Sequence, residues 1–226
     1  MIRFWILGGF LLLCSARARS DEILDRTVAT VNGHVVLLSD LEDELRVECF
    51  LQNHAITQIT QEDRKAALDR LTDQELLREQ MRTAELKPIP AEAVQEQVNT
   101  IKEDAVRVRA GKSWETILSE HGVSEKLVEK HVADELQELR FIDARFRPSV
   151  QVSPEEIQEY YKDELVPKLP VSDPVSLAEI APKIREILVQ KKIDQMLETW
   201  LQELRTQATI RILQSSDGAP SQSGTR

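Results

Sequence analysis

A short apolar ribbon near the N-terminus places the strongest constraint on what this chain can fold into. Residues 27–38 are largely β-branched residues and leucines on both sides of Asn32-Gly33, a pair that tolerates the positive φ angles of a tight hairpin turn. The sequence therefore predicts that the chain doubles back here. Because an isolated two-stranded ribbon is barely stable in water, its apolar face needs a third strand or a helix from elsewhere in the chain.

Ser39 follows this ribbon and predicts the start of the first helix. Its hydroxyl can accept from the first free amides of a helix, and Glu42 can reach back to the Ser39 amide, which is the pattern of a capping box. We expect this helix over residues 40–53. Cys49 falls on its apolar face and is interpreted as a small core residue, because no second cysteine or basic cluster near it indicates a reactive thiol.

Similar starts recur along the chain and predict a mainly α fold. Each start has a capping side chain, a proline or both just before an apolar pattern of helical spacing, and the expected starts are Thr60, Ala91, Ser113, Ser124 and Ser153. Ser176 with Glu179 can cap a further turn. Pro182 is expected to open or kink a last long amphipathic helix that continues to Arg205.

The C-terminal part of the sequence predicts a partner for the early ribbon. Residues 209–213 alternate as a strand does, whereas residues 214–226 are mostly serine, glycine and polar residues and are predicted to be disordered. An early hairpin and a late strand both need a partner. We therefore expect a small antiparallel sheet, formed by the N-terminal hairpin and the C-terminal strand, that joins the two ends of a mainly helical chain.

The first residues differ in composition from the rest. Arg3, an apolar run over residues 4–13 and the small-residue motif Ala16-Arg17-Ala18 predict a cleavable signal peptide over residues 1–18 and export to the periplasm. Lipidation of Cys14 is the alternative, which Leu13 disfavours. No later segment approaches the roughly 20 apolar residues of a membrane helix, so no stable membrane insertion is expected.

Charge and motifs exclude several functions. The 226-residue chain has a formal net charge of -10, which makes nucleic acid an unfavourable partner. No glycine-rich phosphate loop and no nucleophile elbow occur, and the four histidines, His34, His54, His121 and His131, lack metal-ligand spacing. The sequence therefore predicts no catalytic residue, no cofactor and no metal.

Three stretches carry a resemblance to a known family. They are VATVNGHVVLLSDLEDEL at 28–45, RFRPSVQVSPEEIQEYYKDEL at 145–165 and the closing KIREILVQKKIDQMLETWLQELRTQATIRIL at 183–213. In this order they resemble the SurA family of periplasmic chaperones over nearly all of the chain after the signal peptide. The resemblance implies one chaperone module, in which a helical domain at 19–165 packs with a C-terminal helix and strand at 176–213.

This chain departs from the family at one place. Parvulin-type prolyl isomerase domains are inserted in the family after the helix that corresponds to residues 153–165, but here only the proline-punctuated residues 166–175 separate that helix from the closing one. We interpret these residues as a linker that replaces the isomerase domain. The resemblance therefore implies a chaperone core without its catalytic part.

The resulting hypothesis is a periplasmic holdase that binds unfolded outer-membrane proteins or other exported polypeptides without catalysis. Two alternatives remain open: a peptidyl-prolyl isomerase-related protein with residual or no activity, and an adaptor for one specific envelope partner. Candidate peptide-binding residues are apolar or aromatic side chains of the central helices and of the helix after Ser153, although each is more often core than contact. They are Trp114, Leu118, Leu136, Phe141 and Tyr161.

Overall fold

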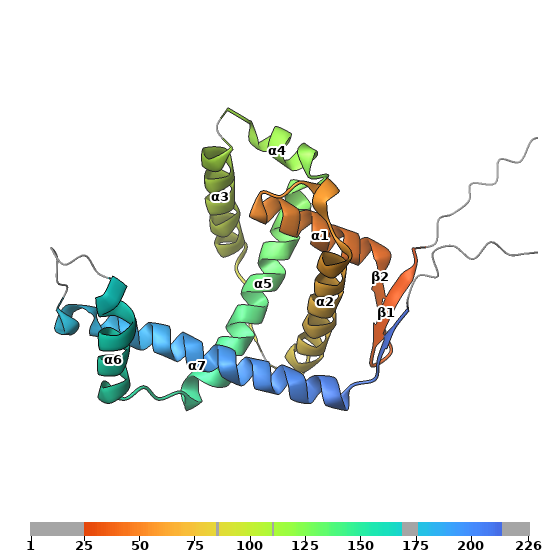
Figure 1. Cartoon of the computed structure of the whole chain (residues 1–226). Coiled ribbons are helices and arrows are strands. Elements are labelled where there is room, and N and C mark those ends of the chain that lie inside the picture. The colour runs from red at the N-terminus through yellow and green to blue at the C-terminus, as the bar shows by residue number, and fades with distance from the viewer. Residues whose placement is uncertain (1–24, 85, 110, 169–175, 214–226) are drawn as a thin grey trace, which may run out of the picture.

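The computed structural model describes residues 25–84, 86–109, 111–168 and 176–213. The predicted signal peptide and C-terminal tail lie outside these residues, as does most of the predicted linker. The described chain is mainly helical with one small antiparallel sheet (Figure 1), which confirms the predicted fold class. None of the described helices is both long and apolar enough to cross a membrane.

Seven α-helices and three strands form the framework of the described residues, joined in places by short 3₁₀ or π turns. In chain order they are β1 (Thr27–Val31), β2 (His34–Leu37), α1 (Leu38–Gln52), α2 (Gln61–Met81), α3 (Ala91–Val108), α4 (Trp114–Glu120), α5 (Glu125–Phe146), α6 (Pro154–Tyr160), α7 (Leu177–Gln207) and β3 (Ile210–Ile212). Figure 1 shows α7 as a long rod with α6 near one end and the sheet at the other. Helix α5 rises from the middle of this rod toward α3 and α4.

The sheet joins the two ends of the chain, as the sequence predicts. Its strand order is β2-β1-β3, with both pairs antiparallel. Asn32 and Gly33 form the hairpin turn with φ angles of 49° and 89°, the left-handed conformations that this turn requires. The Asn32 side chain also accepts from the Thr209 amide at 2.8 Å and donates to Glu79 at 2.7 Å, so the turn connects β3 with α2.

The predicted cap of the first helix is wrong. Helix α1 begins at Leu38 because β2 runs directly into it, with Leu37 in an extended conformation as the residue before the first turn. Asp40 accepts from the Leu37 amide at 3.0 Å, and the Ser39 hydroxyl donates to Asp25 instead. Ser39 is thus already inside the helix, where its side chain can no longer accept from the first amides.

The other predicted caps are confirmed. At Thr60, Ser124, Ser153 and Ser176 the side chain accepts from the backbone amide three residues on. Ser113 caps α4 in the same way, although the sequence pattern placed it inside that helix. Pro182 does not open the last helix, however, because α7 begins at Leu177 and Pro182 lies inside it. The cap at Ser176 starts the helix early enough for proline to fall within it.

Three buried clusters hold the helices together. The α3–α5 cluster joins α1 with α3, α4 and α5 and includes Phe50, Trp114 and Ile117. The sheet cluster packs β1 and β2 against α1 and α2. The α7 cluster joins α2, α5 and α7 around Phe141 and Ile193. Helix α5 contributes its first half to one cluster and its second half to another, so it connects the two parts of the molecule.

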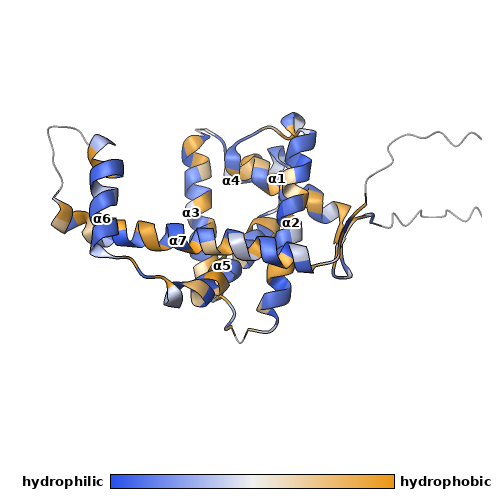
Figure 2. Ribbon diagram, turned by 60° about the horizontal axis from the view of Figure 1, so that its bottom comes forward, coloured by the Kyte–Doolittle hydropathy of each residue, from blue (hydrophilic) through white to orange (hydrophobic). Residues whose placement is uncertain are grey.

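Helix α7 extends beyond the helices that pack against it. It packs against α2, α5 and α6, and Lys192 in the middle of α7 pairs with Glu156 of α6 at 2.6 Å. Figure 2 shows hydrophobic and hydrophilic residues alternating along the whole of α7. Part of its apolar surface therefore remains at the surface of the molecule.

Candidate functional site

The five candidate peptide-binding residues do not form one surface. Trp114 and Leu118 are buried in the α3–α5 cluster, and half-buried Leu136 packs against it. Phe141 is buried in the α7 cluster, while Tyr161 is half-buried just after α6. Their positions are those of core and supporting residues, and peptide binding by these side chains stays a prediction.

A groove along α7 combines apolar side chains with a polar surround. This α7 groove has a volume of about 810 Å³ and lies between α7 and the segment that follows α5. Its apolar side chains are Phe146, Val150, Met196 and Trp200. Serine, glutamine, threonine, lysine and glutamate side chains surround them, namely Ser149, Gln151, Lys192, Gln195, Thr199 and Glu203.

Trp200 is held in place from several sides. Its ring lies 5.6 Å from that of Phe146 in an edge-to-face arrangement and 6.1 Å from that of Phe141. The Arg145 guanidinium lies 4.1 Å from the Trp200 ring centroid, which is close enough for a cation–π interaction. The groove therefore has a rigid aromatic wall that is positioned before any ligand arrives.

Met196 supplies the adaptable part of the same groove. It lies four residues before Trp200 on α7 and is exposed. Its unbranched side chain can adjust to ligands of different shape, which is why methionine is common at promiscuous binding surfaces. A rigid aromatic wall beside a flexible side chain is suited to apolar segments of varied sequence.

The helical spacing of the sequence puts Met196 and Trp200 on the apolar face of the last helix, but it does not distinguish them as a site. Helical spacing shows which residues share a face, and that signal was present. It does not show how far a neighbouring helix extends along that face. Because α5 ends at Phe146 and the chain turns away at Arg147–Ser149, the next turns of α7 are left partly uncovered.

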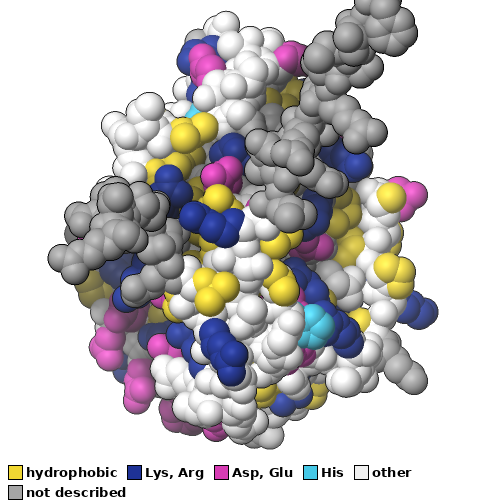
Figure 3. All heavy atoms as spheres, turned by 90° about the vertical axis from the view of Figure 1, so that its right-hand side faces the viewer, with side chains coloured by type: hydrophobic (Ala, Val, Ile, Leu, Met, Phe, Trp, Pro, Cys, Tyr) yellow, Lys and Arg dark blue, Asp and Glu magenta, His cyan; other side chains and the backbone are white. Residues whose placement is uncertain are grey.

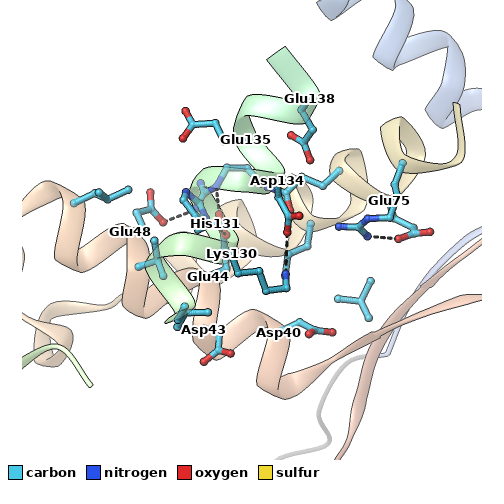
Figure 4. Close-up of a pocket in the computed structure, with 18 of the residues that line it drawn as sticks. Asp40, Asp43, Glu44, Glu48, Glu75, Lys130, His131, Asp134, Glu135 and Glu138 are labelled. Carbon is cyan, nitrogen blue, oxygen red and sulfur yellow. Dashed lines mark hydrogen bonds and ion pairs between the residues drawn. The ribbon is translucent and has the colours of Figure 1, made fainter. Parts of the chain in front are cut away.

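A second hollow, here named the acidic cavity, lies between α1, α2 and α5 and has a volume of about 720 Å³. Figure 4 shows charged side chains from the three helices around it. Its lining carboxylates are Asp40, Asp43, Glu44, Glu48, Glu75, Asp134, Glu135 and Glu138, against the bases Arg70, Arg78, Lys130 and His131. The cavity thus carries an excess of negative charge.

Ion pairs neutralise only part of this charge. Arg70 donates to Glu44 at 3.2 Å and also pairs with Glu48, and Lys130 pairs with Asp134 at 2.9 Å. Within the described ranges no ion pair reaches Glu138, which is half-buried on α5. Burial, together with the smaller effects of the neighbouring carboxylates Asp134, Glu44 and Glu135, raises the pKa of Glu138 to about 7, against the opposing effect of Arg78.

We expect Glu138→Gln to stabilise the protein at pH 8 and not at pH 4. The pKa of Glu138 is about 7 in the folded protein and roughly 4.3 in the unfolded chain. Below pH 4 the carboxyl group is protonated in both states, so the substitution removes no charge. As the pH rises through 7, the ionised folded state bears a cost that the unfolded state does not. Urea unfolding should give about 1–2 kcal/mol more stability at pH 8, after allowance for partial solvation.

Glu135→Gln is the matched control for this prediction, because Glu135 is an exposed carboxylate on the same helix. It should change the free energy of unfolding by less than about 0.5 kcal/mol at either pH. An equal gain for both variants would mean that general charge repulsion, rather than the burial of Glu138, destabilises the cavity.

Among the described residues, one group of side chains has the ligand types and spacing of a metal site. Ligand atoms of His34, Glu75 and Glu79 lie within 4.8 Å of one another. Arg82 approaches the same atoms, with Nη1 at 3.0 Å from His34 Nε2 and Nη2 donating to Glu75 at 3.0 Å, and Arg78 also pairs with Glu75. Two guanidinium groups therefore supply the positive charge here, and we interpret the cluster as a charge network that joins β2 to α2.

Comparisons of the chain with protein-family models and with curated proteins found no match. The structure itself defines the class of protein: a helical module, closed by a small sheet, with an open apolar groove and a separate acidic cavity.

Proposed function

We propose that this protein is a periplasmic holdase that binds apolar segments of unfolded outer-membrane proteins, without catalysis. The observation that carries the proposal is the α7 groove, which combines a fixed aromatic wall, a flexible methionine and a polar rim. The predicted signal peptide supports the periplasmic location. The order of the sequence motifs, which resembles that of the SurA family, supports the chaperone class.

The chemistry of the clients fits such a groove. A membrane β-strand in transit exposes apolar residues at every second position and aggregates through them. A volume of about 810 Å³ is in the range of ligand-binding clefts and accommodates several apolar side chains. Because the groove is open to solvent and offers a client segment only a few apolar side chains, binding is expected to be weak and readily reversed, as release of a client requires.

Met196→Glu should impair the holdase activity. A urea-unfolded outer-membrane barrel protein is diluted with increasing amounts of the purified chain after removal of residues 1–18, and aggregation is followed by light scattering. A carboxylate at position 196 must be desolvated when an apolar segment enters the groove. The chaperone concentration for half-maximal suppression should therefore rise at least about threefold.

Leu139→Glu is the matched control. Leu139 is also an exposed apolar residue on a long helix, but it does not line the α7 groove, so its substitution should leave suppression unchanged. Equal losses in both variants would argue against the groove as the client site. If the unmodified chain suppresses no aggregation and co-purifies with one envelope protein at a fixed ratio, the adaptor hypothesis replaces the holdase.

A further inference from the structure

Among the residues that the structure describes, no strand pairs with the outer edge of β3, which leaves a row of open backbone hydrogen-bonding groups there. Thr209 accepts from the Asn32 amide at 3.0 Å and Leu213 donates to the Val28 carbonyl at 2.9 Å, and Arg211 pairs with Thr30 between them. Residues 209, 211 and 213 therefore face β1. Since neighbouring residues of a strand point their amides and carbonyls in opposite directions, Ile210 and Ile212 direct theirs toward the free edge.

The side chains along this edge are unusually apolar for an exposed strand. Ile212 is 51% exposed, although its cross-strand neighbour Ala29 is buried. Leu213 is also exposed. Figure 3 shows hydrophobic and basic side chains next to one another on the face of the molecule where the sheet lies. Buried Ala29 and exposed Ile212 are thus neighbours, so apolar side chains reach the outer edge of the described sheet and are exposed there.

Arg211 adds a charge to this edge. It lies between the two isoleucines, on the opposite face of the strand, and is exposed. Within the described part of the chain it has no ion-pair partner. An acidic side chain on an incoming strand, directly opposite Arg211, would provide one at the close distance of a non-hydrogen-bonded antiparallel pair.

We propose that the free edge of β3 binds one extended strand of an unfolded polypeptide, in antiparallel pairing, with apolar residues opposite Ile210 and Ile212 and an acidic residue opposite Arg211. Such strand addition satisfies the open amides and carbonyls through the main chain and selects the ligand through alternate side chains. The assignment of an exported polypeptide as the natural ligand rests on the proposed holdase function. Binding of a strand to β3 can be measured without assuming that function.

Two other occupants fit the edge less well. Full antiparallel overlap with β3 of a second copy places Arg211 opposite Arg211, which is unfavourable for like charges. Residues 214–226 contain proline and no valine, isoleucine or leucine, so they lack the alternating apolar pattern that would cover Ile212. A foreign strand with an acidic residue between two apolar ones matches both features.

The test uses the purified chain without residues 1–18 and the peptide Ser-Thr-Val-Glu-Val-Thr-Ser. Amide hydrogen exchange, followed by NMR, should slow at Ile210 and Ile212 when the peptide is added, because these amides gain acceptors. The Arg211 amide, which already faces Thr30, should change much less. Replacing glutamate by lysine in the peptide should weaken binding roughly fivefold at low salt.

Arg211→Glu is the matching change in the protein. Because Arg211 is exposed, the variant should fold normally, and it should prefer the lysine peptide to the glutamate peptide. A glutamate peptide with N-methyl groups on both valines should not bind either protein, since it cannot donate to the carbonyls of Ile210 and Ile212. Reversal of the charge preference with retention of the alternating exchange pattern is the expected result.

Four outcomes would overturn the proposal. The first is that the peptide does not slow exchange at Ile210 and Ile212, and the second is that Arg211→Glu does not change the peptide preference. The third is that both amides already exchange slowly without peptide at every protein concentration. The fourth is that their protection without peptide increases with protein concentration and a dimer mass appears. The third would mean that the chain covers its own edge, and the fourth that a second copy does. Aggregation suppression is measured on the same samples, so loss of the holdase function and loss of strand binding are distinguished.

Discussion

Phe50→Ala is expected to lower the free energy of unfolding by about 3–5 kcal/mol, the range for removal of a buried aromatic side chain. Phe50 is 1% exposed. Its ring lies 5.6 Å from that of Trp114 and 6.0 Å from that of His121, and the Arg109 guanidinium lies 5.5 Å from its centroid. One side chain on α1 thus contacts α4 and the residues that directly follow α3 and α4, so its loss leaves a cavity where these three helices meet.

Leu51→Ala is the control for this prediction, because Leu51 is the next residue on α1 and is 45% exposed. Urea unfolding should show a change of less than about 0.5 kcal/mol for Leu51→Ala. Comparable losses for the two variants would contradict the burial of Phe50 and would mean that α4 does not close over α1 in solution.

Ile193→Ala is expected to cost about 2–4 kcal/mol and to loosen α7 before the rest of the molecule. Ile193 is 1% exposed and packs in the α7 cluster with Leu77 and Phe141. Apart from this cluster, the C-terminal half of α7 is held by the ion pair of Arg205 with Asp73 at 2.6 Å. A pair this exposed contributes little on its own, so the apolar contact is the principal attachment.

Native-state hydrogen exchange measures this local effect. In Ile193→Ala the amides of α7 and β3 should exchange faster, while those of α4 and the first half of α5 keep their protection, because these belong to a different cluster. Ile187→Ala, at a position on the same helix that is 40% exposed, should change neither stability nor exchange appreciably. Uniform loss of protection in Ile193→Ala would instead indicate a single cooperative unit.

The local elements were predictable because their signals lie within a few residues. The Asn32-Gly33 turn and the caps at Thr60, Ser124 and Ser153 depend on backbone conformations that particular side chains favour. The sheet was predictable for a different reason: a ribbon and a late strand each have unpaired edges, and each is the simplest partner for the other. The cap at Ser39 failed because a strand that continues directly into a helix shifts the first turn by two residues.

The candidate site was less predictable. Trp114, Leu118 and Phe141 were chosen as large apolar residues of central helices, and the structure buries all three. Large apolar side chains are the common material of cores and of binding sites, so residue type does not distinguish the two. Met196 and Trp200 have the same helical spacing as their buried neighbours on α7, yet they line a groove.

By itself the sequence determined where the chain turns and where most helices begin, because these features depend on interactions between near neighbours. It also determined which strands complete the sheet, because an unpaired strand edge needs a hydrogen-bonding partner. The tertiary structure alone decided which apolar faces are covered. Burial at Ile193 and exposure at Ile187 and Ile212 follow from where α5 ends and where β3 lies at the edge of the sheet. Coverage of a face depends on the length and position of another element, which no local pattern of residues contains.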